Sequence, residues 1–500
     1  MKLKRFFRKI TAAVVSTALA AGMLTAGLSV SAAQSTPAGY ITVNGAFAAA
    51  HADAIAAVAQ GFRSFQNRVD VRQYGLSTED TKLVFSSVMN MYPELFYVNY
   101  QFSYSYNSSG VTAIVPSYDY TAAQVNTMMA EFDEKSEYYL SKITPGMSDF
   151  DKALVLHDEL ILNSSYLLEG TTYTLMVNGT GKCEDYSRAY AFLLAQVGVK
   201  CEMILSPKYT QDDDGMQHQW VKVCIDGVYY HVDPTWDDPV AVDSYSYRNS
   251  GETRPNGYEG RVAHTYFLVS DSLINSTALG DAHTGYTTMF TSPATYDNAW
   301  FRNVNSRICC VDGSYYAVNT GSGNRTQLIC CDTATGTPAA VMSRTFYWSA
   351  GGNYYYNGSF SGLDYCDGLF YFNGPNAVYT YDPVAGTVTE YAQNPSQDQI
   401  FGMRIFNRNV IAYTASSPGD LSEAWLLGHI DEPLPPLMLG DVNGDEVVDI
   451  SDATLMQRAI AEYETIDARQ QTAADFNADG TLSVGDVTLV QKQIAHITAA

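Results

Sequence analysis

The stretch Gly181-Lys182-Cys183-Glu184-Asp185-Tyr186 determines the fold, because it begins a segment with helical periodicity that Gly198 ends as a C-terminal glycine. The apolar residues of this segment are Tyr186, Tyr190, Leu193, Leu194 and Val197. Cys183 therefore lies in the first helical turn, at the edge of the apolar stripe. The free N–H groups and positive dipole end of a helix N-terminus stabilise a thiolate, so this position favours a reactive cysteine over a buried structural one.

A two-residue turn, Asp226-Gly227, predicts a β-hairpin between strands at 219–225 and 228–232. One face of this hairpin is apolar and suits a core: Val221, Val223, Ile225, Val228, Tyr230 and Val232. The other face carries His218, Trp220, Lys222, Cys224, Tyr229, His231 and Asp233. The two-residue turn places Lys222 opposite His231. In this register His218 and Asp233 become diagonal neighbours about 7 Å apart at Cα, which lets the carboxylate orient the imidazole.

A thiol, an imidazole and a carboxylate are thus available for a catalytic triad. We predict Cys183 as nucleophile, His218 as general base and Asp233 as the residue that orients it. The backbone N–H of Cys183 is the predicted oxyanion-hole donor. His231 is a rival base on the same face, but Asp233 would reach it only along one strand, so we interpret it as structural. His157 is expected to pack on its own helix.

Three ordered motifs resemble a bacterial transglutaminase-like domain. They are Gly-Lys-Cys-Glu-Asp-Tyr-Ser-Arg-Ala-Tyr at 181–190, His-Gln-Trp at 218–220 and Val-Asp-Pro-Thr-Trp-Asp-Asp-Pro at 232–239. An upstream helix with Lys-Ala-Leu-Val-Leu-His-Asp at 152–158 is also similar to that family. The resemblance implies a papain-like α+β catalytic domain over residues 140–289.

The same resemblance implies the triad roles given above for Cys183, His218 and Asp233, with no cofactor for catalysis. Trp220 and Gln219 are expected to line the substrate cleft, and Gln219 stands where many relatives have a small residue. The expected activity is cleavage of protein or peptide amide bonds through an acyl-thioester, because water is abundant outside the cell and no motif marks an amine-acceptor site.

Two alternatives to amide hydrolysis remain open. Protein crosslinking by transglutamination would use the same acyl-enzyme with an amine as acceptor. A catalytically silent accessory protein is the other alternative, and in that case the tyrosine-rich middle region would bind carbohydrate. Aromatic side chains suit sugar binding, although they also pack strands together.

Two copies of an acidic loop, 34 residues apart, occupy the C-terminal segment. Each places oxygen ligands at positions 1, 3, 5, 9 and 12 and a backbone carbonyl at position 7, the oxygen-rich set that Ca²⁺ requires. A short helix is expected after each loop but not before it. The predicted ligands of two Ca²⁺ ions are Asp441, Asn443, Asp445, Val447, Asp449, Asp452, Asp475, Asn477, Asp479, Thr481, Ser483 and Asp486.

This duplicated segment, residues 440–500, resembles a type I dockerin, the module that docks enzymes onto the cohesins of a cellulosome-type scaffold. The resemblance implies a cohesin module of a scaffoldin as partner. It places the partner-selecting residues at loop positions 10 and 11, which are Ile450, Ser451, Val484 and Gly485. Glu446 replaces the usual glycine at position 6 of the first loop, which predicts strain or weaker Ca²⁺ binding there.

Residues 1–33 have the pattern of a secretory signal peptide: five Lys and Arg in the first nine residues, an apolar run over 10–28 and a small-residue stretch. Losing those five cations would shift the formal net charge from −24 to −29, which excludes nucleic acid as a partner. No later segment has 18 uninterrupted apolar residues, so we expect no transmembrane segment after cleavage and a secreted, scaffold-associated protein at the cell surface. An uncleaved N-terminal anchor is the alternative.

The rest of the chain predicts three further parts, which together with the domains above give an α+β multidomain protein. Residues 34–139 alternate helical and strand patterns and are expected to pack on the catalytic domain. Residues 290–430 are rich in Tyr and Gly and predict a β-rich module, in which 312–316 and 367–371 resemble each other. Residues 431–439 form a Pro-rich linker.

Overall fold

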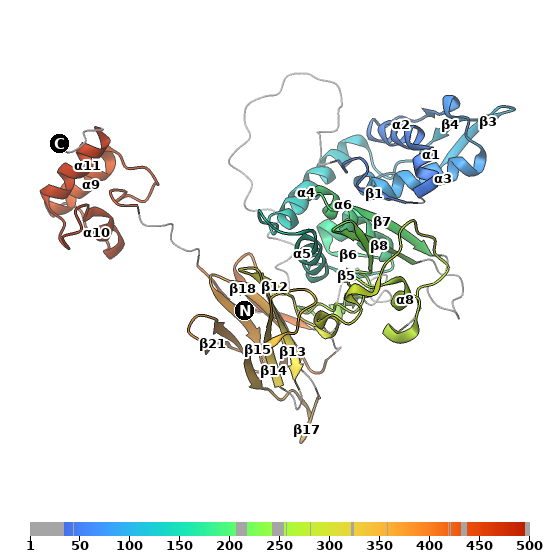
Figure 1. The fold of residues 1–500 in the computed structure, drawn as a ribbon. Helices are drawn as coiled ribbons and strands as arrows, with labels where there is room; N and C mark the ends of the chain where they lie inside the picture. The colour runs from blue at the N-terminus through green and yellow to red at the C-terminus, as the bar shows by residue number, and fades with distance from the viewer. Residues whose placement is uncertain are drawn as a thin grey trace. The chain divides into compact units, whose positions relative to one another are not determined.

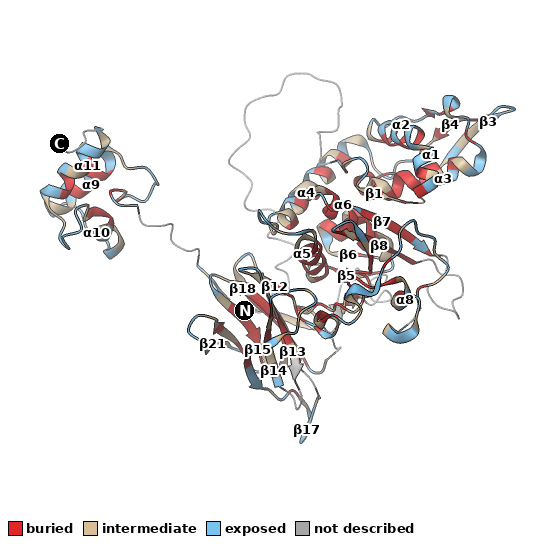
Figure 2. Ribbon diagram, viewed as in Figure 1, coloured by how far each residue is buried: buried red, intermediate tan, exposed pale blue. Residues whose placement is uncertain are grey.

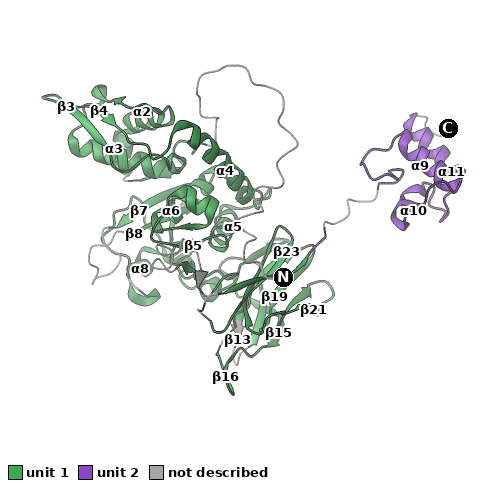
Figure 3. Ribbon diagram, turned by 180° about the vertical axis from the view of Figure 1, so that it is seen from behind, with its two compact units in different colours: residues 1–429 green, residues 430–500 purple. Residues whose placement is uncertain are grey.

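The computed structural model describes residues 35–206, 218–242, 255–256 and 258–495, with further gaps at residues 44, 281, 322–324, 358, 419, 421 and 432–437. The chain divides into two compact units between His429 and Ile430 (Figure 3). The first unit mixes helices with several sheets and the second is helical, which confirms the predicted α+β multidomain class. The predicted signal peptide and most of the predicted linker lie outside the described residues. Among the described helices, none has the length and apolar character needed to span a bilayer.

A four-stranded sheet in the order β1-β7-β8-β9 forms the centre of the first unit (Figure 1). Its strands are β1 (Ile41–Thr42), β7 (Cys201–Ser206), β8 (His218–Ile225) and β9 (Val228–Val232). In the β8–β9 hairpin Lys222 lies opposite His231, and both turn residues have positive φ, 51° at Asp226 and 84° at Gly227. The predicted hairpin and its register are therefore confirmed.

Helices pack on the apolar face of this sheet. The helices α5 (Asp149–Leu162) and α6 (Cys183–Gln196) contact the sheet, and α4 (Ala122–Leu140) packs on these two helices. Of these, α6 lies directly against β7 and β8, with α5 beside it. Val221 and Val223 of β8 are buried with Leu193 of α6 in one hydrophobic cluster, which Figure 2 shows as the red interior. Burial of this stripe stabilises α6 more than its local propensity does.

The opposite face of the hairpin is buried as well. An irregular segment over residues 258–293, which includes α8 (Asp271–Ile274), runs across it, and His231 pairs with Val269 in an isolated bridge. Lys222 is fully buried, and its ammonium donates to Asp271 at 2.7 Å. The polar residues of this face are therefore paired in the interior instead of hydrated.

The N-terminal region shares its core with the central sheet. Its elements are α1 (Gly45–Ala50), α2 (Ala52–Arg63), α3 (Thr78–Met91) and a small sheet of β2 (Val69–Asp70), β4 (Gly110–Val115) and β3 (Ser103–Asn107). Val58, Phe62 and Val84 from these helices belong to the same hydrophobic cluster as Leu193 of α6. This region therefore packs on the central sheet and its helices without a separate interior.

A second small sheet fixes the start of α6. Its strands, in spatial order, are β11 (Pro255–Asn256), β10 (Ala241–Val242), β5 (Ser165–Tyr166) and β6 (Thr180–Gly181). Strand β6 pairs in parallel with β5, which follows the end of α5. The backbone hydrogen bonds between β6 and β5 thus hold the chain just before Cys183, and α6 continues from it.

Residues 309–429 form three antiparallel meanders. The first contains β12 (Cys309–Val311), β13 (Ser314–Gly321), β14 (Arg325–Cys331) and β15 (Ala339–Thr345), and the hairpin of β16 (Ser349–Gly351) and β17 (Tyr354–Tyr355) follows it. The second contains β18 (Leu363–Cys366), β19 (Leu369–Asn373), β20 (Ala377–Asp382) and β21 (Thr387–Gln393). The third contains β22 (Gln399–Phe406), β23 (Asn409–Ala415) and β24 (Glu423–His429).

The two similar stretches noted in the sequence are the first hairpins of the first two meanders. Their turns, Asp312-Gly313 and Asp367-Gly368, have positive φ at both residues. The third meander has Asn407-Arg408 in the same role, again with positive φ at both residues. This third copy escapes a sequence comparison because its turn lacks the Asp-Gly pair.

Arg307 joins the meanders to α5. Its guanidinium donates to Glu159 on α5 at 2.6 Å and to Asp364 on β18 at 2.8 Å, and both carboxylates are buried. Arg404 on β22 adds hydrogen bonds to the carbonyl of Leu162 and the side chain of Asn163, at the end of the same helix. These charged bridges fix the meanders against α5.

Within its described residues, the second unit contains three helices, α9 (Ile450–Ile460), α10 (Ala468–Ala474) and α11 (Val484–Ile494). Its small core consists of Val442, Ala453, Met456, Ile466, Ala473, Ala474, Val487 and Val490. Helices α9 and α11 follow the two acidic loops as predicted. Helix α10 precedes the second loop, so the prediction of no preceding helix is wrong there. A capping box between Asp467 and Gln470 begins this short helix, whose apolar periodicity is weak.

Replacing Arg307 with methionine should lower the free energy of unfolding of the first unit by about 3–5 kcal/mol, because two buried carboxylates would lose their partner. Urea unfolding of the full chain measures this loss. R408M is the matched control, since Arg408 pairs with the partly exposed Asp367 and should contribute no more than about 1 kcal/mol. Equal losses in the two variants would contradict the bridging role of Arg307.

Candidate active site and calcium loops

Cys183 is the first residue of α6, and its side chain is half-buried. Before it, Lys182 turns the backbone into the helix, and the Asp185 carboxylate accepts the Lys182 N–H at 3.1 Å. The Ser187 hydroxyl lies within hydrogen-bond distance of the backbone carbonyls of Cys183 (2.7 Å) and Gln219 (2.8 Å). These contacts fasten the N-terminal turn of α6 to the start of β8, and they hold the thiol at a fixed point.

His218 begins β8 and Asp233 follows the end of β9, so the hairpin places the two side by side. Nε2 of His218 lies 2.6 Å from Oδ2 of Asp233, and both side chains are buried. The side chain of Cys183 forms a hydrogen bond with His218. Because Asp233 occupies Nε2, Nδ1 is the ring nitrogen left to face the thiol. The structure thus brings together all three residues proposed from the sequence as a triad.

The charges of this site stabilise each other. Burial disfavours the protonated form of His218, but the negative charge of Asp233 and the hydrogen bonds that His218 makes to Asp233 and Cys183 outweigh it and raise the pKa of His218 to about 10. Burial also acts to raise the pKa of Asp233, yet the charge and hydrogen bond of His218 hold that pKa well below its usual range. At neutral pH the pair is therefore an imidazolium beside a carboxylate.

A fourth side chain, His283, completes the environment of Asp233. Oδ1 of Asp233 accepts the backbone N–H groups of Thr235 (3.1 Å) and Trp236 (3.3 Å), and Oδ2 lies 2.9 Å from Nε2 of His283. His283 was not among the residues predicted from the sequence. It lies 50 residues from Asp233 in an irregular segment, where neither strand nor helix periodicity marks a residue as facing the site.

Trp220 and Gln219 are interior side chains, contrary to the prediction that they line the cleft. Trp220 is fully buried, stacks beside His218 with ring centroids 5.6 Å apart, and donates its indole N–H to Nδ1 of His231 at 2.8 Å. Gln219 is also buried and donates to the side chain of Asn90 at 3.1 Å. Both are enclosed because β8 is covered on both faces.

His231, the rival base, has a different set of partners. An indole N–H can only donate, so Nδ1 of His231, which accepts it from Trp220, carries no proton. Nε2 of His231 lies 2.9 Å from Asp271. Burial lowers the pKa of His231 to about 4, and the positive charge of Lys222 adds to this effect. His231 is therefore a neutral ring that supports Trp220.

A second buried polar network lies where α5 meets the loop after β9. Nδ1 of His157 is 2.9 Å from Asp158 and its Nε2 is 3.2 Å from Asp237, while Nε2 of His264 is 3.0 Å from the same oxygen of Asp158. Burial opposes protonation of His157, but its hydrogen bonds to Asp158 and Asp237 prevail and raise its pKa to about 9. His157 is thus the charged centre of a network and not the simple packing residue that we expected.

Within the described residues, two sets of side chains have the composition of a metal site: His218, Asp233 and His283, and His157, Asp158 and His264. In each set one carboxylate oxygen lies 2.6–3.0 Å from nitrogens of both imidazoles. The would-be ligand atoms are therefore hydrogen-bonded to one another. We interpret both sets as hydrogen-bond networks that compensate a buried carboxylate.

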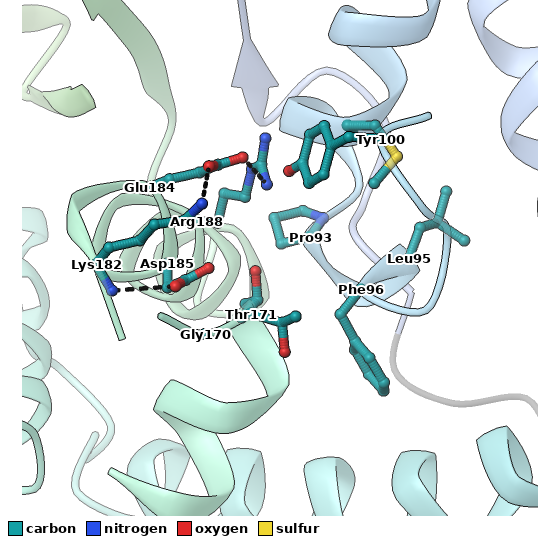
Figure 4. A pocket seen from close by; sticks show the side chains of 12 residues that line it. Pro93, Leu95, Phe96, Tyr100, Gly170, Thr171, Lys182, Glu184, Asp185 and Arg188 are labelled. Carbon is teal, nitrogen blue, oxygen red and sulfur yellow. Dashed lines mark hydrogen bonds and ion pairs between the residues drawn. The ribbon is translucent and has the colours of Figure 1, made fainter. Parts of the chain in front are cut away.

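A pocket lies beside the N-terminus of α6 (Figure 4). Lys182, Glu184 and Arg188 line one side, and Tyr100 and Phe96 lie opposite. Glu184 pairs with Lys182 at 3.1 Å and with Arg188 at 2.5 Å, so one carboxylate links both cations of this wall. The two residues that flank Cys183 in the chain thus line a hollow formed with the N-terminal region.

The two acidic loops of the second unit have the same hydrogen-bond pattern. The carboxylate at position 1, Asp441 or Asp475, accepts the N–H of position 5 at 3.2 and 3.0 Å. The buried carboxylate at position 12, Asp452 or Asp486, accepts the N–H of position 3 at 3.0 and 3.1 Å and that of position 9 at 2.9 Å in both loops. Each loop is therefore closed around its acidic side chains, an all-oxygen donor set that fits Ca²⁺.

Each loop needs a left-handed backbone at positions 4 and 6. The φ values are 79° at Gly444 and 66° at Glu446 in the first loop, and 56° at Ala478 and 89° at Gly480 in the second. Each loop therefore has glycine at only one of the two positions. The expected strain at Glu446 is confirmed, and a side chain in this conformation costs about 1 kcal/mol.

The predicted partner-selecting residues lie on the surface of the second unit. Ile450 begins α9 and Val484 begins α11, and they are 61% and 67% exposed. Ser451 and Gly485 follow them and are also exposed. Each of the two helices therefore begins with an exposed aliphatic side chain. These side chains form a small apolar surface beside each loop, which a partner can cover.

Two family models match the chain. Residues 137–234 match the transglutaminase-like superfamily, and residues 439–495 match the dockerin type I domain. The chain carries a transglutaminase-like core followed by a C-terminal type I dockerin, which confirms both resemblances and their order. Domains of the dockerin type I family bind calcium.

Similar solved structures include a candidate cysteine protease from Cytophaga hutchinsonii (12% identity, TM-score 0.18), a candidate protease from Parabacteroides distasonis (16%, 0.17) and a TGase (11%, 0.19). They align with 27%, 26% and 32% of this chain. This chain spans 61%, 29% and 48% of their length, less than two thirds in each case. No curated protein matches the chain.

Stability should depend on pH through His157. Its pKa rises to about 9 on folding, so its ion pairs contribute fully below about pH 6.5, the usual histidine value, and this contribution is lost as pH rises through 9. We expect H157Q to lower the free energy of unfolding by about 2–3 kcal/mol at pH 6 and by less at pH 10. Urea titrations at several pH values measure the difference.

For this experiment H429Q is the control, because His429 is exposed on β24 and should show no such dependence. A loss in H157Q that grows between pH 6 and pH 10 would mean that His157 is neutral in the folded chain.

Replacing Glu446 with glycine should relieve the strain at position 6 of the first loop. We expect that loop to bind Ca²⁺ up to about fivefold more tightly, the equivalent of about 1 kcal/mol. Calorimetric titration of the full chain with Ca²⁺ resolves this change. A478G relieves position 4 of the second loop and should tighten the other site instead. An E446G variant with wild-type affinity at both sites would show that backbone strain does not limit binding.

Proposed function

We propose that this chain is a secreted, dockerin-docked cysteine enzyme that hydrolyses protein or peptide amide bonds through an acyl-thioester at Cys183. The observation that carries the proposal is the hydrogen-bonded series from Cys183 through His218 to Asp233, held at the N-terminus of α6. The match of residues 137–234 to the transglutaminase-like superfamily, which spans these three residues, supports it.

Acylation begins from a thiolate beside the His218 imidazolium. The sulfur of Cys183 attacks the amide carbon and forms a C–S bond, while the carbonyl oxygen takes up negative charge. The backbone N–H of Cys183, in the first turn of α6, is the proposed donor to that oxygen. The imidazolium then gives its proton to the amide nitrogen, the C–N bond breaks, and the amine leaves a thioester on the enzyme.

Hydrolysis of the thioester reverses these roles. Neutral His218 takes a proton from water, whose oxygen attacks the thioester carbon. The C–S bond breaks, and the carboxylic product leaves with the thiolate and imidazolium restored. Asp233 stays ionised throughout and holds Nε2 of His218. The other ring nitrogen, Nδ1, therefore exchanges the proton in both halves of the reaction. A primary amine in place of water at this step would give an isopeptide, which is the transglutaminase alternative.

The pocket beside α6 is the proposed place where substrate approaches the half-buried thiol. It lies next to Cys183 along the chain, and it presents the aromatic rings of Tyr100 and Phe96 opposite the paired charges of Glu184 and Arg188 (Figure 4). An extended peptide could place one side chain there while its backbone passes the sulfur. This assignment replaces Trp220 and Gln219 as the cleft wall.

The second unit is proposed to hold the enzyme on a scaffold. Two Ca²⁺ ions would order the acidic loops, and the exposed residues that begin α9 and α11 would contact a cohesin. The closed hydrogen-bond pattern of the loops and the exposure of Ile450 and Val484 support this role.

The test of the enzymatic proposal is incubation of the wild-type chain and C183A with a protein library, read by mass spectrometry for new termini and for isopeptides. We expect new peptide termini with the wild type and none with C183A, since the variant lacks the nucleophile. C310A is the matched control, because Cys310 is a half-buried thiol on β12 away from the site and its loss should leave activity unchanged. Isopeptides with release of ammonia would instead indicate transglutamination.

Alkylation by iodoacetamide tests the nucleophile without a substrate. Cys183 should react fastest of the eight cysteines, since burial raises the pKa of the thiols of Cys201 and Cys310. Equal and slow labelling of all eight, with no new termini or isopeptides, would contradict the proposal and favour the accessory-protein alternative.

A further inference from the structure

The carboxylate of Asp233 is shared by two imidazole rings. Its Oδ2 lies 2.6 Å from Nε2 of His218 and 2.9 Å from Nε2 of His283, and all three side chains are buried. His283 comes from the segment after α8, where its backbone N–H donates to the carbonyl of Ile274 at 2.9 Å. The triad proposed above therefore has a second histidine behind its acid.

Aromatic rings fix the orientation of His283. The Trp220 ring stands nearly perpendicular to it, at 88° with centroids 5.0 Å apart, and the Trp236 ring lies at 4.9 Å. Tyr266 lies at 5.3 Å on a further side. These contacts leave the imidazole little freedom to turn away from Asp233. Trp220 also stacks on His218, so one indole positions both rings.

The protonation of the three groups follows from their contacts. Asp233 is ionised, because the charge and hydrogen bond of His218 and the hydrogen bond of His283 overcome the effect of burial on its pKa. An ionised carboxylate only accepts hydrogen bonds, so both Nε2 atoms carry a hydrogen. His283 therefore provides a second N–H to the oxygen that holds the proposed base.

We propose that His283 is a positioning residue that acts through Asp233, sharing Oδ2 with His218 so that the carboxylate stays in place without holding the His218 proton too strongly. This inference rests on the proposed function and deepens it. Backbone N–H groups bind Oδ1 of Asp233, whereas Oδ2 is bound by the two imidazoles. Without His283, the charge on Oδ2 would face His218 alone.

The consequence for the reaction falls on thioester hydrolysis. That half-reaction needs neutral His218 to take a proton from water, and a stronger hold by Asp233 keeps His218 protonated. The other titratable groups around the two rings are Cys183 on α6, His231 on β9 and Tyr266, and Tyr286 lies against the Trp220 ring. Burial keeps His231 neutral, with a pKa of about 4, and raises the pKa of Tyr286 to about 12, so neither changes charge between pH 6 and pH 9.

The experiment uses the full chain acylated at Cys183 by p-nitrophenyl acetate, with the rate of thioester hydrolysis measured from pH 6 to pH 9. We expect H283L to shift the rate profile to higher pH by about 0.5–1 unit, which is about a 3- to 10-fold slower rate at pH 7. H283Q restores an N–H near Nε2 and should give a profile close to wild type. H283F, which fills the aromatic cage without a donor, takes the place of H283L if that variant does not fold.

H264L is the matched control, since His264 makes the same kind of buried bond to Asp158 in the second network. It should lower stability without shifting the profile. A wild-type profile in folded H283L, or a shift in H283Q equal to that in H283L, would overturn the positioning role. A wild-type chain that p-nitrophenyl acetate does not acylate at Cys183 would instead contradict the proposed function, so the two failures are distinct.

Discussion

An ionised carboxylate with no exposure to solvent is the constraint on which this site depends. Burying a charge such as that of Asp233 costs several kcal/mol unless hydrogen bonds replace its hydration. Four N–H groups do so here, two from the backbone just after β9 and two from imidazoles. The hairpin register supplies His218, and the tight turn that follows supplies Thr235 and Trp236. The same contacts that make burial tolerable also fix which nitrogen of His218 faces the thiol.

This constraint extends through one loop into the rest of the first unit. The N–H of Asp237 donates to the carbonyl of Asp233 at 3.1 Å, and the carboxylate of Asp237 contacts His157 on α5 and accepts the N–H of Tyr266 at 2.8 Å. Next to His157 along α5, Asp158 accepts the N–H of Ile308, at the start of the β meanders, at 2.9 Å. The meanders are therefore part of the framework that keeps the site in place. The sequence pattern changes near residue 290, but the hydrophobic core continues across that point.

Local rules predicted much of the site. A two-residue Asp-Gly turn permits one register, so the pairing of Lys222 with His231 followed from the sequence, and a helix begun at Cys183 followed from its apolar spacing. His283 could not be predicted, because its contact with Asp233 is made by an irregular segment whose path depends on tertiary packing. The burial of Trp220 depends on that same segment. The pattern of β8 shows which face is apolar, but it does not show that the polar face is covered.

The duplicated loops show how similar backbones can differ energetically. Both need left-handed residues at positions 4 and 6, and glycine relieves strain at position 4 in the first loop and at position 6 in the second. The remaining strain therefore lies between ligand positions 5 and 7 in the first loop and between positions 3 and 5 in the second. Helices α9 and α11 begin directly after these loops, at Ile450 and Val484. The two exposed helix starts thus share a geometry, while each follows a loop that is strained at a different position.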